Sequence, residues 1–179
     1  NGGLVVVAAD DPSMHSSQNE QDSRFYGKFA LVPTFEPADQ QEAYDMAKAA
    51  FDLSERFRIP VLMRLTTRMA HSRAVVETGE ARAETPLSHP EQPRQWVLMP
   101  GNSRVRYQTL LEDYARLEEE SAASPFNAYT EGPDKRLGIV ACGICVISRR
   151  RRLLRDSLGR GLRGGKRLVR GACLLLPGG

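Results

Sequence analysis

The chain has 179 residues, of which 41% are hydrophobic and 26% are charged, the balance of an ordinary globular protein with one domain or one domain and part of a second. No apolar run reaches the roughly 18 to 20 residues that a membrane-spanning helix needs, and no basic segment of a secretory signal opens the chain. Three cysteines, Cys142, Cys145 and Cys173, do not make a disulfide scaffold and favour a reducing, cytoplasmic setting. Since the chain opens without methionine, directly before an apolar strand pattern, we expect a further segment upstream.

The net charge of +3 conceals a sharp asymmetry along the chain. Residues 1–148 carry 15 basic and 21 acidic side chains, a net charge of −6, whereas residues 149–179 carry ten basic and one acidic, a net charge of +9. We therefore expect residues 149–179 to be a separate Arg/Gly/Leu-rich tail. Its arginines suit phosphate contacts with nucleic acid, but no aromatic side chain is interleaved for stacking on bases. Out-of-frame translation of a GC-rich gene gives the same composition, and we favour that origin over a nucleic-acid partner.

The first part of the chain alternates strand and helix patterns. Residues 3–10 form a continuous β-branched apolar run, which predicts a strand buried on both faces, as in a parallel sheet. Residues 19–30 predict a short helix with Phe25 and Phe29 on one side. Residues 31–37 predict a second, short strand.

The clearest helix begins after Asp39. This residue is a good N-cap, Glu42 completes a capping-box pattern, and apolar or small residues recur at helical period across residues 43–57. Pro60 ends the helix and opens a third strand over residues 60–68. The order of strand, helix, strand, helix and strand predicts a right-handed βαβαβ unit whose helices cover a parallel sheet.

The second part of the chain is less regular. Residues 73–104 show no period and are rich in proline, which predicts an extended linker. Residues 105–123 predict an amphipathic helix. Residues 137–147 predict the first strand of another α/β unit.

Polar side chains are concentrated in residues 10–24, directly after the first predicted strand. Ligands of doubly wound sheets bind at the carboxyl ends of parallel strands, so this loop is expected to line a cleft rather than to be a plain solvated loop. Arginine pairs bidentately with carboxylates, and serine and histidine hydrogen bond a neighbouring oxygen. The candidate cleft residues are His15, Ser16, Ser17, Gln18, Gln21 and Arg24, with Arg24 the candidate for carboxylate recognition.

Two charged pairs lie near the same strand ends. Asp10 and Asp11 are a possible acid/base pair, but we favour the simpler interpretation that they end the strand and accept loop N–H groups. Arg64 and Arg68 should share one face of the third strand, where they either line the cleft or face solvent. His15 has no second His or Cys at ligand spacing, so no metal site is predicted.

The segment CGIC gives Cys142 and Cys145 the spacing of a thiol redox pair. Such a pair belongs at a helix N-terminus after a strand and beside an apolar cis-proline loop. Here both cysteines fall inside the strand predicted over residues 137–147, and no such loop is evident. We therefore interpret the spacing as a coincidence. A single CxxC also cannot form a four-cysteine zinc or iron–sulfur site.

The block DDPSMHSSQNEQDSR at residues 10–24, and residues 2–73 around it, closely resemble the alpha subunits of the indolepyruvate ferredoxin oxidoreductases. These are thiamine diphosphate-dependent 2-oxoacid oxidoreductases. The resemblance continues more loosely from Arg104 to near Cys145, so it covers about four fifths of the chain. It implies that residues 1–72 are the second half of a parallel-sheet α/β domain that binds the pyrimidine of thiamine diphosphate. Residues 73–136 would then be a linker with one amphipathic helix, and residues 137–148 the first strand of a following α/β domain.

The resemblance also implies an activity, which is the oxidative decarboxylation of aryl 2-oxoacids such as indolepyruvate to aryl-acetyl-CoA. The implied cofactors of the complete enzyme are thiamine diphosphate with Mg²⁺ and 4Fe–4S clusters. The implied partners are a beta subunit, ferredoxin, coenzyme A and the oxoacid, with no membrane partner.

Several parts of that enzyme have no match in the chain. The glutamate that contacts the pyrimidine lies upstream in the family, and neither the GDG motif that holds diphosphate and Mg²⁺ nor the cysteine-rich segment occurs here. We therefore expect a fragment that binds none of these cofactors alone and is inactive alone. The alternatives are another 2-oxoacid oxidoreductase, for example one acting on pyruvate, a transketolase-like thiamine enzyme, and a non-enzymatic nucleic-acid-binding module with a basic tail.

Overall fold

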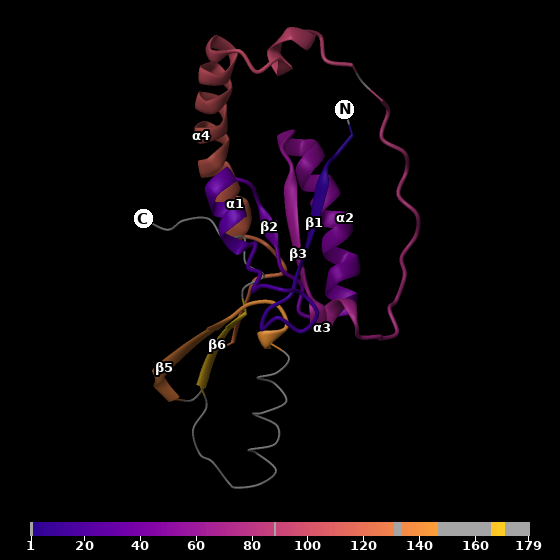
Figure 1. Ribbon diagram of the computed structural model, residues 1–179, viewed down its shortest axis with the longest axis vertical. Helices are drawn as coiled ribbons and strands as arrows, with labels where there is room; N and C mark the ends of the chain where they lie inside the picture. The colour runs from indigo at the N-terminus through magenta and orange to yellow at the C-terminus, as the bar shows by residue number, and fades with distance from the viewer. Residues whose placement is uncertain (1, 88, 131–133, 147–165, 171–179) are drawn as a thin grey trace, which may run out of the picture.

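The computed structural model describes residues 2–87, 89–130, 134–146 and 166–170 (Figure 1). Its first unit is a three-stranded parallel sheet of β1 (Val5–Asp10), β2 (Thr34–Phe35) and β3 (Val61–Thr66), in the order β1-β3-β2. Helices α1 (Arg24–Ala30) and α2 (Gln40–Phe57) connect these strands. The prediction of a partial parallel-sheet α/β unit is therefore confirmed.

The predicted cap of α2 is present, with one difference. Asp39 Oδ1 accepts a hydrogen bond from the Glu42 N–H at 2.9 Å, as expected of an N-cap. Glu42 Oε2, however, accepts from the N–H of Ala38 at 2.6 Å, one residue before the cap, instead of from Asp39 itself. Both bonds fix the point at which the chain leaves β2 and enters α2.

The core lies between α2 and one face of the sheet. Strand side chains alternate between faces, so Val61 and Met63 of β3 point toward α2 while Leu62 and Arg64 point away from it. Burying each large apolar side chain of this kind contributes about 1.5–3 kcal/mol. The buried cluster consists of Phe35, Met46, Ala50, Leu53, Phe57, Val61, Met63 and Leu117.

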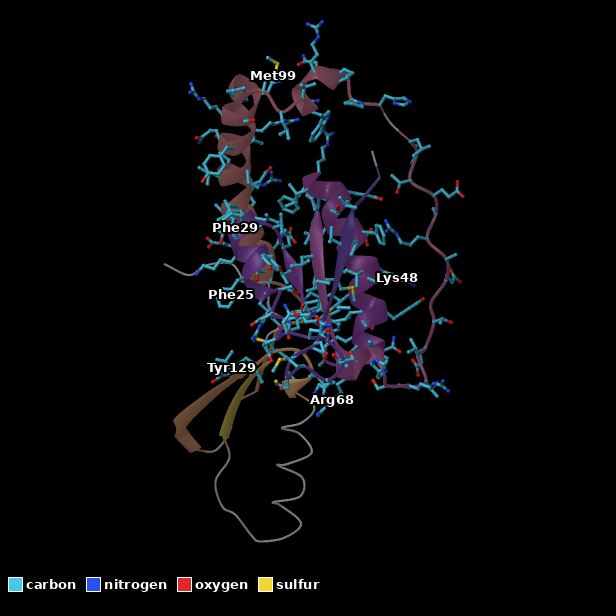
Figure 2. All side chains as sticks on the ribbon, in the orientation of Figure 1. Phe25, Phe29, Lys48, Arg68, Met99 and Tyr129 are labelled. Carbon is cyan, nitrogen blue, oxygen red and sulfur yellow. The ribbon has the colours of Figure 1, made fainter. Side chains whose placement is uncertain are left out.

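The opposite face of the sheet receives α1 through its single buried residue, Gly27. A Cβ at this position would collide with the Thr34 side chain, so only glycine allows α1 to approach β2 this closely. The predicted aromatic side of the helix is exposed, with Phe25 at 70% and Phe29 at 89% (Figure 2). The helix begins at Arg24, later than the predicted residue 19, because residues 11–23 form the polar loop.

Two boundaries in the middle of the chain differ from the prediction. The third strand ends at Thr66, and the short helix α3 (Thr67–Ala70) takes the two residues that were assigned to the strand. After it, an extended segment runs as a wide arc past α2 to the 3₁₀ turn η1 (Pro93–Trp96) (Figure 1). Helix α4 (Pro100–Ala122) begins five residues before the predicted start, since Pro100 occupies its first turn, where a missing N–H costs nothing.

A second sheet follows α4. It consists of β4 (Ala128–Thr130), β5 (Asp134–Ala141) and β6 (Lys166–Arg170) in the order β4-β6-β5, with β5 and β6 parallel and β4 and β6 antiparallel. Strand β6 falls within the Arg/Gly/Leu-rich tail, whose other residues lie outside the described ranges. The predicted domain boundaries and the origin of the tail stay predictions.

The strand predicted over residues 137–147 ends at Ala141, and this corrects the placement of the cysteines. Gly143 has φ of +53°, the left-handed region that glycine adopts at least cost and that a strand cannot contain. Cys142 therefore follows the strand, and Cys145 begins a helical segment after the turn at Gly143 and Ile144. Within the part of the chain that the structure describes, no helix is long and apolar enough to cross a membrane.

Candidate functional site

A pocket of about 460 Å³ lies at the carboxyl ends of the parallel strands, and we call it the carboxyl-edge pocket. One side comes from the loop after β1, with Ser13, His15 and Arg24. The floor and a second side come from Glu36, Arg64 and Arg68, the last of which Figure 2 labels beside α3. The third side is the turn after β5, with Cys142, Ile144 and Cys145. The pocket thus forms where the topology of parallel sheets predicts a ligand site.

A buried arginine holds the strand ends together beneath this pocket. Arg64 of β3 donates from Nε to Asp10 Oδ2 at 2.5 Å, and its Nη1 pairs with Glu36 Oε1. All three side chains are less than 8% exposed. A buried charge is tolerable only when it is paired, so these carboxylates and the guanidinium depend on each other. One arginine therefore ties the end of β1 to the residue that follows β2.

The loop after β1 is folded around Asp11. Its Oδ2 accepts hydrogen bonds from the N–H groups of Ser16 and Ser17, both at 2.6 Å, and its Oδ1 accepts from the Thr67 hydroxyl at 2.5 Å. The Thr67 hydroxyl and then the Ser16 N–H hold the pKa of Asp11 well below its usual range. The Asp11 N–H donates in turn to Gln21 Oε1 at 3.0 Å. Asp11 thus closes the loop into a ring of about ten residues, spanning Asp11 to Gln21.

Asp10 fixes the other end of the loop. Its Oδ2 accepts from the Ser23 N–H at 2.7 Å and from the Ser23 hydroxyl at 3.0 Å, beside the ion pair with Arg64. These bonds set the start of α1. The interpretation that Asp10 and Asp11 end the strand and accept loop N–H groups is therefore confirmed, and both side chains are occupied in holding the loop.

The six predicted cleft residues divide into three groups. His15 and Arg24 line the carboxyl-edge pocket. Ser16, Ser17 and Gln21 make the hydrogen bonds that shape the loop, and Gln18 is exposed outside the pocket. Two of the six predicted residues, His15 and Arg24, therefore line the pocket, and the other four do not. The roles of the six residues in binding stay predictions.

Arg24 is held in place by its neighbour Asp22. Nε donates to Oδ1 at 2.8 Å and Nη2 to Oδ2 at 2.6 Å, a bidentate pair that fixes the plane of the guanidinium. The pair raises the pKa of Arg24 and lowers that of Asp22. The charge of Glu36, and that of Cys142 in its thiolate form, also raise the pKa of Arg24.

The two other arginines of the site have different surroundings. Both Arg64 and Arg68 line the pocket, which agrees with the first of the two alternatives considered for them. Arg64 is 4% exposed and neutralised by its carboxylates, whereas Arg68 in α3 is exposed. Arg24, which is paired with Asp22 but exposed, and Arg68 therefore supply the accessible guanidinium groups of the pocket.

Glu36 is the site residue that the sequence reasoning missed. It is 5% exposed, its Oε2 has no hydrogen-bond partner, and it lines the pocket. The turn after β5 lies directly against it, because a Cβ on Gly143 would stand 2.7 Å from Glu36 Cγ. The available signal was an acidic residue at the end of the apolar segment LVPTFEP. Among the described residues, no group of three or more His, Cys, Asp and Glu is placed to hold a metal ion.

Comparison with known proteins gives relatives of a single kind. No protein-family model and no solved structure matches the chain. The chain is 47% identical over 146 residues to indolepyruvate oxidoreductase subunit IorA of Archaeoglobus fulgidus, and 46% identical over 143 residues to that of Methanothermobacter marburgensis. It is 45% identical over 151 residues to that of Pyrococcus horikoshii.

These alignments cover 79–80% of the chain and 23% of each relative, so the chain spans about a quarter of the length of the curated relatives it matches. The identities confirm the resemblance that was predicted from residues 2–73 and from the segment that ends near Cys145. Over four fifths of its length, the chain is a relative of part of the IorA subunit of indolepyruvate oxidoreductases.

Proposed function

We propose that the chain forms one wall of the substrate cleft in an enzyme that oxidatively decarboxylates aryl 2-oxoacids such as indolepyruvate. The products would be aryl-acetyl-CoA and reduced ferredoxin. The relatives' name, indolepyruvate oxidoreductase subunit, supports the class of enzyme. The observation that carries the proposal is the carboxyl-edge pocket, where Arg24 and Arg68 present positive charge beside His15.

A 2-oxoacid offers a carboxylate next to a carbonyl, and the loop after β1 suits both groups. Asp22 engages Nε and Nη2 of Arg24, which leaves Nη1 to donate to a substrate carboxylate without any change in the position of the side chain. The exposed imidazole of His15 stands on the same side of the pocket, where it can donate to the carbonyl oxygen. Arg24 would thus bind and orient the substrate, and His15 would assist it.

The far side of the pocket supports an aryl substrate over a small one. Val140 is 75% exposed, and together with Ala141 and Ile144 it gives the pocket an apolar surface opposite the arginines. An indole ring laid against this surface would remove apolar area from water, at about 25 cal/mol per Å². Pyruvate has only a methyl group to place there.

Thiamine diphosphate is the cofactor that the resemblance implies, and the chain fits one half of it. The orphaned Oε2 of Glu36 is an acceptor that the amino group of a pyrimidine can satisfy. When bound, the cofactor supplies the carbanion chemistry that decarboxylation needs. Mg²⁺ and diphosphate need a cluster of oxygen ligands, and no cluster of three metal-binding side chains occurs among the described residues. We propose that other parts of the complete subunit hold them.

The 4Fe–4S clusters would also be held by other parts of the complete enzyme. Each cluster takes four cysteine thiolates, and the chain has three cysteines, of which Cys142 and Cys145 line the pocket. We therefore propose that the clusters, the beta subunit and ferredoxin engage other parts of the enzyme. The 179 residues alone would be inactive.

The proposal is tested on a complete IorA-type subunit that carries these residues, assembled with its partner subunit. Ferredoxin reduction is followed with coenzyme A and with indolepyruvate, pyruvate or 2-oxoglutarate as the oxoacid. We expect kcat/KM for indolepyruvate to exceed the other two by about tenfold or more, since each group that fills an apolar pocket contributes that much discrimination. A preference for pyruvate or 2-oxoglutarate would refute the aryl substrate. Turnover by the 179 residues alone would refute their proposed inactivity.

A further inference from the structure

The turn after β5 brings two thiols to one side of the carboxyl-edge pocket. The Cys145 N–H donates to the Cys142 carbonyl at 3.2 Å, and the next N–H, of Val146, donates to the Gly143 carbonyl at 3.1 Å. The first and last Cα atoms of such a turn lie within about 7 Å, and a disulfide joins Cα atoms about 4.4–6.8 Å apart. The backbone therefore already holds Cys142 and Cys145 at the spacing that one disulfide spans.

The turn is anchored against the first sheet. Ala141 and Val146, on either side of the two cysteines, are buried against Ala38. Between them, Gly143 packs on the Glu36 side chain. The two cysteines are thus part of a fixed pocket wall.

The pocket places the two cysteines on the same cavity as exposed guanidinium groups. Both cysteines are thiols in the structure, Cys145 is exposed, and both line the pocket that Arg24 and Arg68 also line. Arg24 interacts electrostatically with Cys142. A guanidinium beside a cysteine stabilises the thiolate, which is the nucleophile in disulfide exchange.

The carboxylates around the pocket are each held by neighbouring groups, with Asp10 on Arg64 and Asp11 on the loop N–H groups. Asp22 is paired with Arg24, and Glu36 is paired with Arg64. The loop side of the pocket also carries His15. The interpretation of the CxxC spacing as a coincidence depended on two grounds. The first, that both cysteines fall inside a strand, is wrong, since β5 ends at Ala141. The second, that no cis-proline loop lies beside them, stands, because the described residues contain no cis peptide bond.

We propose that Cys142 and Cys145 are a redox-active dithiol on the wall of the carboxyl-edge pocket, which reacts with small-molecule disulfides and closes to an internal disulfide. The Cys142 thiolate attacks one sulfur of the incoming disulfide, forms a mixed disulfide and releases one thiolate. The Cys145 thiolate then attacks the Cys142 sulfur, forms the Cys142–Cys145 bond and releases the second. The two thiol protons pass to the two released thiolates, and the small disulfide takes up the two electrons. This activity does not depend on the proposed oxoacid chemistry.

The test uses the full 179-residue chain in glutathione redox buffers at pH 7. Samples are quenched with acid, remaining thiols are alkylated, and each cysteine is assigned by mass spectrometry of peptides. We expect a Cys142–Cys145 disulfide as the main product, with Cys142 reacting about tenfold faster than Cys173, the control thiol of the same chain. Mixed disulfides without the internal bond, or equal rates for Cys142 and Cys173, would overturn the proposal.

Three variants separate the steps. Cys145→Ser should accumulate the mixed disulfide at Cys142, and Arg24→Ala should slow the first step several-fold, while Arg104→Ala, at an exposed arginine of α4, should leave it unchanged. Equal rates in Arg24→Ala and Arg104→Ala would overturn the assigned role of Arg24. Circular dichroism tests whether each variant is folded. If a variant is not folded, the proposal is judged from the rates of Cys142 and Cys173 in the unaltered chain.

Discussion

Arg64 and Asp10 form an ion pair across 54 residues of sequence, with Nε and Oδ2 at 2.5 Å and both residues no more than 6% exposed. The same Asp10 oxygen accepts the Ser23 N–H at the start of α1. This pair therefore links the middle strand of the sheet, the end of β1 and the last residues of the polar loop. Through Glu36 it extends to the floor of the carboxyl-edge pocket.

Replacing Arg64 with methionine should strongly destabilise the chain. Two buried carboxylates would lose the guanidinium that they share, and removing one partner of a buried ion pair costs about 3–5 kcal/mol. The free energy of unfolding from urea titration at pH 7 measures the loss. Arg104→Met on the exposed side of α4 is the matched control, with an expected change within about 0.5 kcal/mol. A loss below about 1 kcal/mol for Arg64→Met would contradict this expectation. It would mean that the two carboxylates become hydrated or protonated when the guanidinium is removed.

The low pKa of Asp11 predicts a pH dependence of stability. Its folded-state pKa lies below the ordinary 3.8, because the Thr67 hydroxyl and the loop N–H groups favour the carboxylate. The resulting stabilisation is complete above the unfolded pKa and is lost as the pH falls through 3.8 toward the folded pKa. Unfolding midpoints in urea between pH 7 and pH 3 should therefore fall more steeply for the unaltered chain than for Asp11→Asn. Equal slopes would mean that Asp11 does not titrate in this way.

Two glycines in helices give a matched pair of substitutions. Gly27→Ala should destabilise the chain by about 1–3 kcal/mol, since the new Cβ collides with the Thr34 side chain and overpacking costs that much. Gly101→Ala should be neutral or stabilising by up to about 1 kcal/mol, because a Cβ there meets nothing within 4 Å and alanine has the higher helix propensity. Thermal unfolding measures both. A stabilising Gly27→Ala would show that α1 does not pack on β2 as described.

Local patterns were sufficient to predict the first unit of the fold. The N-cap at Asp39 and the 3.6-residue period predicted α2, and the β-branched runs predicted β1 and β3 with their parallel order. The prediction that β1 is buried on both faces is wrong, since Val6 is 45% and Val7 57% exposed. The ends of elements were harder to predict. Thr67 and Arg68 repeat the residue types of Thr66 and Arg64 in β3, so composition does not mark the strand end. At this point Thr67 contacts Asp11, a residue far away in sequence.

The polar loop shows why the site could be predicted only in part. Ser16, Ser17, Gln21, His15 and Arg24 are all residue types that bind ligands, and equally types that stabilise loops. Which of them face the pocket depends on the position of Asp11, and composition does not reveal that. The end of β5 before Cys142 was equally hard to predict. The apolar run continues through Gly143, and composition does not reveal that this glycine has a positive φ.

The account is tested most directly by the KM for indolepyruvate of Arg24→Ala in a complete, assembled enzyme, beside Arg104→Ala. If Arg24 binds the substrate carboxylate, its loss should raise KM about 10- to 100-fold, the effect of one hydrogen bond to a charged group, while kcat and thiamine diphosphate affinity change less than about twofold. Arg104→Ala should match the unaltered enzyme. An unchanged KM in Arg24→Ala would contradict the assignment of this pocket to oxoacid binding.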